Sequence, residues 1–113
     1  MLVNSENAKA QMRKGVLELC ILSILSQNDA YPTEIIDKLK ETKLVVVEGT
    51  LYPLLTRLKN TGLLTYRWEE STSGPPRKYY MLTEIGAQYL KELKVSWDDL
   101  VDSVNKTILN TKN

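Results

Sequence analysis

Side chains that donate hydrogen bonds gather between Gly49 and Leu64, around an apolar stripe. The stripe follows the i, i+3, i+4, i+7 spacing of one helix face and consists of Leu51, Leu54, Leu55 and Leu58. The other faces carry hydroxyl, guanidinium and ammonium groups, which can bond to base edges and phosphates in a DNA groove. An ordinary amphipathic helix with a solvated polar face has the same spacing, so the helix alone leaves both interpretations open. The residues predicted to contact DNA from this helix are Thr50, Tyr52, Pro53, Thr56, Arg57 and Lys59.

A basic hairpin is predicted directly after this helix. Residues 64–69 alternate between apolar and polar types, which predicts a strand. Residues 71–76 read Ser-Thr-Ser-Gly-Pro-Pro and predict a turn, and residues 77–82 predict the returning strand. Tyr79 and Tyr80 are adjacent on that strand, so we expect one in the core and the other outside it. The hairpin residues predicted to contact DNA are Ser73, Gly74, Arg77 and Lys78.

Two further helical segments must position these groups. A broad apolar face over about residues 8–26 predicts a central helix that is covered on more than one side. Residues 28–33 predict a loop, with a second helix opening at its end and ending near residues 41–43. The β-branched residues 44–47 suit a minimal strand or a linker, and we favour the linker. Three helices followed by a hairpin predict a winged helix-turn-helix, a mainly α fold of α+β composition, whose third helix enters the major groove.

The C-terminal residues 83–113 predict one long helix with a short heptad seam. Thr83 is a suitable N-cap. Apolar residues recur at steps of three and four, as in a helix that meets a second copy of the chain, although packing within one subunit is the alternative. A two-fold dimer would place two recognition helices about 34 Å apart and would require a pseudo-palindromic operator. The predicted interface consists of Met12, Val16, Leu90, Leu93, Trp97, Leu100, Val104 and Ile108.

These segments together resemble the PadR family of bacterial transcriptional regulators. The matching stretches are Arg13-Lys14-Gly15-Val16-Leu17-Glu18-Leu19, residues 49–64 with the Tyr52-Pro53 pair, and residues 74–86 with the Arg77-Lys78-Tyr79-Tyr80 run. The chain departs from the family pattern at residues 30–33, before the second helix. The resemblance implies a homodimer in which residues 1–82 bind DNA and residues 83–113 dimerise.

The single C-terminal helix is similar to that of small, multidrug-sensing members of the family, in some of which a tryptophan of this helix lines a cleft between subunits. Trp97 stands at the matching place, followed by Asp98. An acid beside an aromatic ring favours a cationic guest. The resemblance therefore implies a site for a flat apolar or cationic compound, with plain dimer packing as the alternative. Its predicted residues are Trp97, Asp98, Met12 and Val16.

The composition argues against most catalytic chemistry. The chain has no histidine and one cysteine, Cys20, so a zinc site and a Ser-His-Asp or Cys-His nucleophile cannot be built within one chain. We therefore predict a protein that is not an enzyme and needs no metal or cofactor. Cys20 lies on an apolar helix face, which favours an inert buried thiol over a redox sensor.

The length predicts a single domain, and the lone cysteine and the hydropathy predict a cytoplasmic protein. The 113 residues carry a net charge of +1, and residues 41–82 hold six Lys and Arg against four Asp and Glu. The weak excess lies where DNA contacts are predicted. The apolar run 16–25 is interrupted by Glu18 and Ser23 and is too short to span a bilayer, and the first residues do not resemble a signal peptide.

The sequence thus predicts a sequence-specific DNA-binding transcriptional regulator, specifically a homodimeric repressor that a small molecule releases. The alternative is a winged-helix dimer that binds a protein or a ligand without specific DNA binding, which the near-neutral charge favours.

Overall fold

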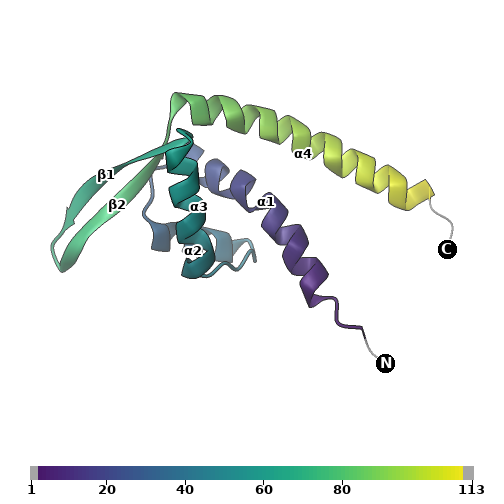
Figure 1. The fold of residues 1–113 in the computed structure, drawn as a ribbon, viewed down its shortest axis with the longest axis horizontal. Coiled ribbons are helices and arrows are strands. Elements are labelled where there is room, and N and C mark those ends of the chain that lie inside the picture. The colour runs from purple at the N-terminus through teal and green to yellow at the C-terminus, as the bar shows by residue number, and fades with distance from the viewer. Residues whose placement is uncertain (1–2, 111–113) are drawn as a thin grey trace.

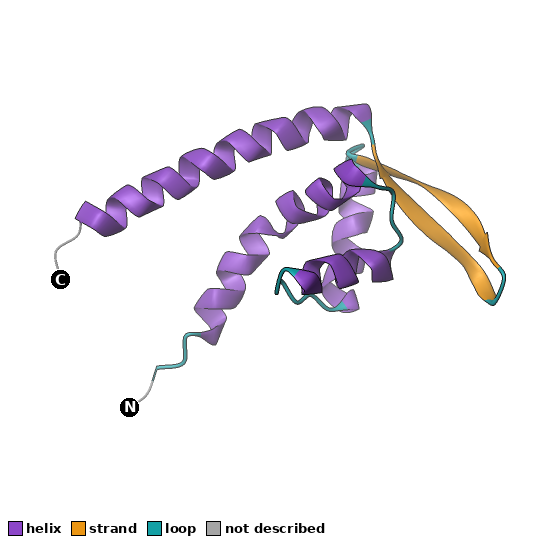
Figure 2. Cartoon of the chain, turned by 180° about the vertical axis from the view of Figure 1, so that it is seen from behind, coloured by secondary structure: helices purple, strands orange, loops and turns teal. Residues whose placement is uncertain are grey.

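The computed structural model describes residues 3–110, which form three helices, a β-hairpin and a long C-terminal helix (Figure 1). The elements are α1 (Glu6–Gln27), α2 (Pro32–Glu41), α3 (Glu48–Asn60), β1 (Leu64–Ser71), β2 (Gly74–Leu82) and α4 (Glu84–Asn110). The hairpin projects on one side of the helices, and α4 runs beside α1 and then away from the hairpin (Figure 2). This is the predicted winged helix, a mainly helical fold with one two-stranded antiparallel sheet. The last three residues of the predicted C-terminal helix, 111–113, lie outside the described residues.

The apolar faces of the first three helices meet in one core. The buried residues of α1 are Leu17, Ile21, Leu22 and Leu25, and the helix extends slightly beyond the predicted 8–26. Leu51, Leu55 and Leu58 of α3 have no exposed surface, and Leu54 is packed at the edge of the core. The leucine stripe therefore anchors α3 and turns its polar residues outward, as its spacing predicts.

The predicted loop before α2 contains a short link to the hairpin. Ala30 and Tyr80 exchange two backbone hydrogen bonds, of 3.2 and 2.8 Å. The Tyr31 backbone N–H then donates to the Glu34 carboxylate at 3.1 Å, which satisfies a free amide where α2 begins. Residues 44–47 are irregular, so the linker interpretation is confirmed.

The hairpin turn is shorter than the sequence predicted. The composition predicts a turn over residues 71–76, but only Thr72 and Ser73 lie outside the strands. Pro75 and Pro76 belong to β2. Both strands are edge strands, where a missing proline N–H can face solvent without loss of a ladder bond. Tyr80 is the buried member of the tyrosine pair, at 5% exposure.

The start of α4 is fixed against the end of α3. The backbone N–H of Gly86 donates to Thr83 Oγ1 at 2.9 Å, so Thr83 is the predicted N-cap. The Thr83 hydroxyl also lies 2.7 Å from the Gly62 carbonyl oxygen. A Cβ at Gly86 would clash with the carbonyl oxygen of Leu63, so glycine allows this close approach. The long helix is thereby held on the three-helix core at one end.

Candidate nucleic-acid interface

The polar residues of α3 divide between two flanks of the helix. Tyr52, Thr56 and Lys59 are spaced i, i+4, i+7 and are exposed. The Nζ atom of Lys59 lies 5.7 Å from the ring centre of Tyr66 on β1. This flank therefore faces the side of the helix on which the hairpin, hereafter the wing, lies.

The other flank of α3 lies beside α1. Thr50, Pro53 and Arg57 line a shallow hollow together with Lys14 and Glu18 of α1. The Nη2 atom of Arg57 lies 3.8 Å from Glu18 Oε2. Of the predicted contact residues on α3, Arg57 thus already has a partner within the chain. Residue spacing does not predict this pair, because the two residues are far apart along the chain and on different helices.

One face of the wing adds a second cation beside Tyr66. The Nζ atom of Lys78 on β2 lies 4.5 Å from the ring centre of Tyr66 and 5.2 Å from that of Trp68. Lys59 and Lys78 therefore approach the same ring from the third helix and from the wing. Cation–π contacts of this kind restrain long lysine side chains and leave their N–H groups free to donate. We call Lys59, Tyr66 and Lys78 the lysine pair site.

The opposite face of the wing is a stack that ties it to the start of α2. The guanidinium of Arg77 lies 4.5 Å from the ring centre of Tyr31, which meets the Tyr79 ring edge-on at 5.1 Å. Arg67 lies 4.9 Å from the ring centre of Tyr79 and forms ion pairs with Glu69 and Asp29, at 2.6 and 3.6 Å. Neither Arg67 nor Tyr31 is among the residues predicted from the sequence to form this surface. The two-residue period of the strands does place Arg67, Arg77 and Tyr79 on one face.

The tip of the wing has no cation. Ser73 and Gly74, predicted to contact DNA, are exposed there, and the charged residues that flank the turn are Glu70 on β1 and Arg77 on β2, which lies opposite Glu69. Trp68 is 61% exposed and lines a surface hollow with Glu70, Pro75 and Pro76. The two cations of β2, Arg77 and Lys78, therefore lie midway along the wing, opposite Glu69 and Trp68.

The predicted dimer seam on α4 is exposed from Trp97 onward. Trp97, Leu100, Val104 and Ile108 are between 41% and 65% exposed, as is expected of an apolar face that a partner covers. Leu90 is different, because it is only 3% exposed and packs in the core of its own chain. Its assignment to the interface was wrong: the first turns of α4 lie on the core, and only the later turns project. Leu93 is partly buried against the same core, and Met12 on α1 is 69% exposed.

Two of the four predicted ligand residues share a hollow between α1 and α4. Val16 and Trp97 line a space of about 150 Å³ with Leu19, Leu93 and Leu100. Asp98 and Met12 do not line it. Small-molecule sites commonly hold about 300–1,000 Å³, so this hollow by itself is smaller than such a site.

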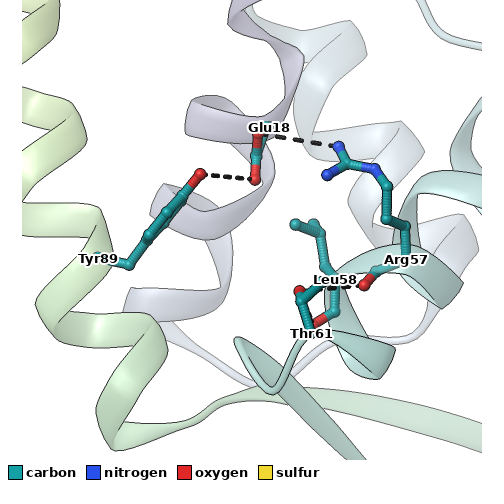
Figure 3. A network of polar contacts seen from close by, with 5 residues as sticks. All are labelled: Glu18, Arg57, Leu58, Thr61 and Tyr89. Carbon is teal, nitrogen blue, oxygen red and sulfur yellow. Dashed lines mark hydrogen bonds and ion pairs between the residues drawn. The ribbon is translucent and has the colours of Figure 1, made fainter.

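Glu18 connects three helices at the inner edge of this region (Figure 3). The Tyr89 hydroxyl of α4 donates to Glu18 Oε1 at 3.3 Å, while Oε2 faces Arg57. Burial raises the pKa of Tyr89, and the neighbouring Glu18 charge raises it further, so the phenol stays protonated and keeps its donor. Burial also raises the pKa of the Cys20 thiol, which lowers its thiolate fraction and agrees with an unreactive side chain.

Comparison with known proteins identifies the family to which the chain is similar. Residues 21–92 match the Transcriptional regulator PadR-like family. The transcriptional regulator YqjI of Escherichia coli is 38% identical over 81 residues, which are 69% of this chain and 37% of YqjI, so the chain spans well under half the length of that relative. No helix among residues 3–110 is long and apolar enough to cross a bilayer.

Solved structures agree with this match. A PadR-like transcription factor from Bacteroides fragilis is 60% identical, with a TM-score of 0.76 over 90% of this chain and 99% of that one. A PadR-like regulator from Bacillus cereus is 42% identical, with a TM-score of 0.78 over 90% and 99%. A PadR family regulator from Eggerthella lenta is 35% identical, with a TM-score of 0.85 over 94% and 92%. Proteins of this family bind DNA, typically as dimers, and are not enzymes. The chain belongs to the PadR-like family of transcriptional regulators.

Proposed function

We propose that this chain is a homodimeric repressor that binds a pseudo-palindromic operator through α3 and the wing. The observation that carries the proposal is the lysine pair site, in which Lys59 and Lys78 extend from two elements toward one ring. Phosphates on the edge of a groove are the partners that two such cations suit. Acting on DNA, the regulator would work in the cytoplasm.

The contact residues fall into two roles in this proposal. Tyr52 and Thr56 face outward from α3 beside Lys59 and would read base edges, since their hydroxyls can donate and accept. Lys59, Lys78 and the exposed part of Arg77 would bind phosphates and set the register. Thr50, Pro53 and Arg57 would contact the neighbouring DNA backbone. Ser73 and Gly74, at the wing tip, would lie along the DNA groove.

The dimer would form through the projecting part of α4 and the first turns of α1. Both helix segments point away from the wing and diverge from one another (Figure 1). Each exposes apolar residues, with Met12 on α1 and Trp97, Leu100, Val104 and Ile108 on α4. A second copy would cover them and would enlarge the space beside Val16 and Trp97, where a flat apolar or cationic compound could bind and release the DNA. In this division residues 1–82 bind DNA and residues 83–113 dimerise.

The test is fluorescence anisotropy of labelled DNA from upstream of the protein's own gene, titrated at several salt concentrations. Lys59→Ala and Lys78→Ala should each weaken binding to every sequence and reduce the slope of log K against log salt by about 1. Thr56→Ala should instead weaken the preferred site selectively, by about 1–3 kcal/mol if it makes a good base contact. Lys94→Ala on α4 is the matched control and should leave the slope unchanged.

Two outcomes would contradict the proposal. Equal slopes of log K against log salt for Lys78→Ala and Lys94→Ala would show that the lysine pair site does not contact DNA. A folded dimer that binds no DNA above the non-specific level would favour the alternative of a winged-helix dimer that binds a protein or a ligand. The acidic wing tip and the net charge of +1 are the features that favour that alternative.

A further inference from the structure

The two carboxylate oxygens of Glu18 contact two different helices, to which the proposed function gives different roles. Oε1 accepts a hydrogen bond from Tyr89 on α4, at 3.3 Å, and Oε2 lies 3.8 Å from Nη2 of Arg57 on α3 (Figure 3). The Glu18 side chain is 24% exposed, so its charge is screened less than a surface charge. One carboxylate thus connects the helix that would dimerise with the helix that would enter the DNA groove.

Arg57 is held loosely and has freedom to change partner. Its side chain is 57% exposed, and 3.8 Å is near the outer limit of an ion pair. Its backbone is better fixed, because the Thr61 hydroxyl lies 3.1 Å from the carbonyl oxygens of both Arg57 and Leu58 and closes the end of α3 (Figure 3). A change at Glu18 would therefore act on the Arg57 guanidinium and leave the helix in place.

A DNA phosphate and Glu18 offer Arg57 the same kind of acceptor. Guanidinium groups pair with carboxylates and phosphates in similar geometry, so one excludes the other at a given N–H pair. The Tyr89 hydrogen bond restrains the rotation of the carboxylate and holds Oε2 toward Arg57. Movement of α4 relative to α1 would break this restraint.

We infer that Glu18 is a positioning residue that competes with DNA phosphate for Arg57, and that Tyr89 makes this competition depend on the placement of α4. The inference rests on the proposed function, because the competition has an effect only if α3 lies against DNA. This competition would let a movement of α4 in the dimer alter the positive charge that α3 presents to the DNA backbone.

The test compares Glu18→Gln, Tyr89→Phe and Glu41→Gln with the parent, in both Arg57 and Arg57→Ala backgrounds. Binding to a labelled duplex of unrelated sequence is measured by anisotropy at several salt concentrations, and the fold is monitored by circular dichroism. Glu18→Gln keeps the acceptor for Tyr89 but removes the charge that holds Arg57. Glu41→Gln removes one negative charge on α2 and controls for net charge.

Glu18→Gln should bind several-fold more tightly than the parent and should increase the magnitude of the salt slope by about 0.9, as one more phosphate is neutralised. Tyr89→Phe should shift affinity in the same direction by a smaller factor. Both increases in DNA affinity should disappear in the Arg57→Ala background. The double-mutant cycles would then show that Glu18 and Tyr89 are each energetically coupled to Arg57. A purely structural role for Glu18 would change the melting temperature and leave the salt slope as it was.

The inference is overturned if Glu18→Gln and Glu41→Gln have equal slopes, or if the gain persists without Arg57. If Glu18→Gln fails to fold, Tyr89→Phe decides alone, because it removes only the hydroxyl. A parent protein that shows no salt-sensitive binding to any duplex overturns the proposed function itself, which distinguishes the two failures.

Discussion

At the scale of single residues, much of the arrangement depends on Gly86 and Thr83, which join α4 to the end of α3. Thr83 caps α4 and also reaches the Gly62 carbonyl oxygen. The absence of a side chain at Gly86 lets the first turn of α4 rest on the backbone of Leu63. The direction of α4 relative to α3 is set at this contact.

Gly86→Ala should therefore destabilise the protein, because the new methyl group clashes with backbone that cannot move like a side chain. We expect a loss of about 1–3 kcal/mol in the free energy of unfolding, as for other overpacked sites. Urea denaturation followed by circular dichroism measures it. Gly49→Ala is the control, since a Cβ there meets nothing within 4 Å, and it should be neutral or slightly stabilising. An equal effect of the two substitutions would refute the close approach.

At the scale of elements, the wing is a two-stranded hairpin that gains rigidity from its neighbours. An isolated hairpin is marginally stable in water. Here Ala30 adds two backbone hydrogen bonds to Tyr80, and Arg77, Tyr31, Tyr79 and Arg67 stack along one face. The stack holds one face of the wing, while Lys78 lies on the other face, beside Tyr66 and close to Lys59 of α3.

Tyr31→Ala should loosen the wing, since it removes a cation–π contact to Arg77 and an edge-to-face contact to Tyr79. Each contact is worth about 0.5–1.5 kcal/mol, so we expect a loss of about 1–3 kcal/mol in stability and weaker DNA binding. Tyr31→Phe keeps the ring and should restore most of both. Hydrogen exchange of the β2 amides checks the mechanism, with faster exchange expected in Tyr31→Ala only. Unchanged protection in that variant would argue against an anchoring role.

At the scale of the whole molecule, the chain is elongated and exposes apolar surface at the end opposite the wing. Its principal extents are 59, 37 and 23 Å, because the wing and α4 project from a small core. A domain of this size buries a limited share of its surface, so covering α4 with a second copy would stabilise the fold as well as pair the recognition helices.

Leu100→Glu should convert a dimer into a monomer or weaken it strongly, because it places a charge in the middle of the proposed seam. Sedimentation velocity over a range of concentrations measures the change, and thermal stability should fall with it. Val95→Glu is the control: Val95 is 61% exposed on the same helix but lies about 140° around the axis from Leu100 at 100° per residue. A dimer that tolerates both substitutions would place the interface elsewhere.

Local pattern determined most of the architecture of this protein. The leucine stripe of α3, the two-residue period of the hairpin and the Thr83 cap each depend on neighbours in the chain, so they were readable from the order of the residues and the helix and strand periods. The same stretches gave the family and the outward-facing polar residues of α3. The turn was the exception, because Pro75 and Pro76 are turn residues by composition but lie at an irregularity in the register of an edge strand, where a missing N–H is tolerated.

Tertiary structure alone decided which of the candidate groups meet. Packing of α4 on α1 makes Leu90 a core residue and leaves the apolar stripe exposed only from about Trp97 onward, a division that a uniform heptad pattern does not contain. Packing also brought Glu18 to both Arg57 and Tyr89, and set Lys59 and Lys78 around one ring while Arg77 stacked on Tyr31. These contacts join residues that are distant along the chain, and their partners follow from how the elements are oriented in space, which residue periodicity does not specify.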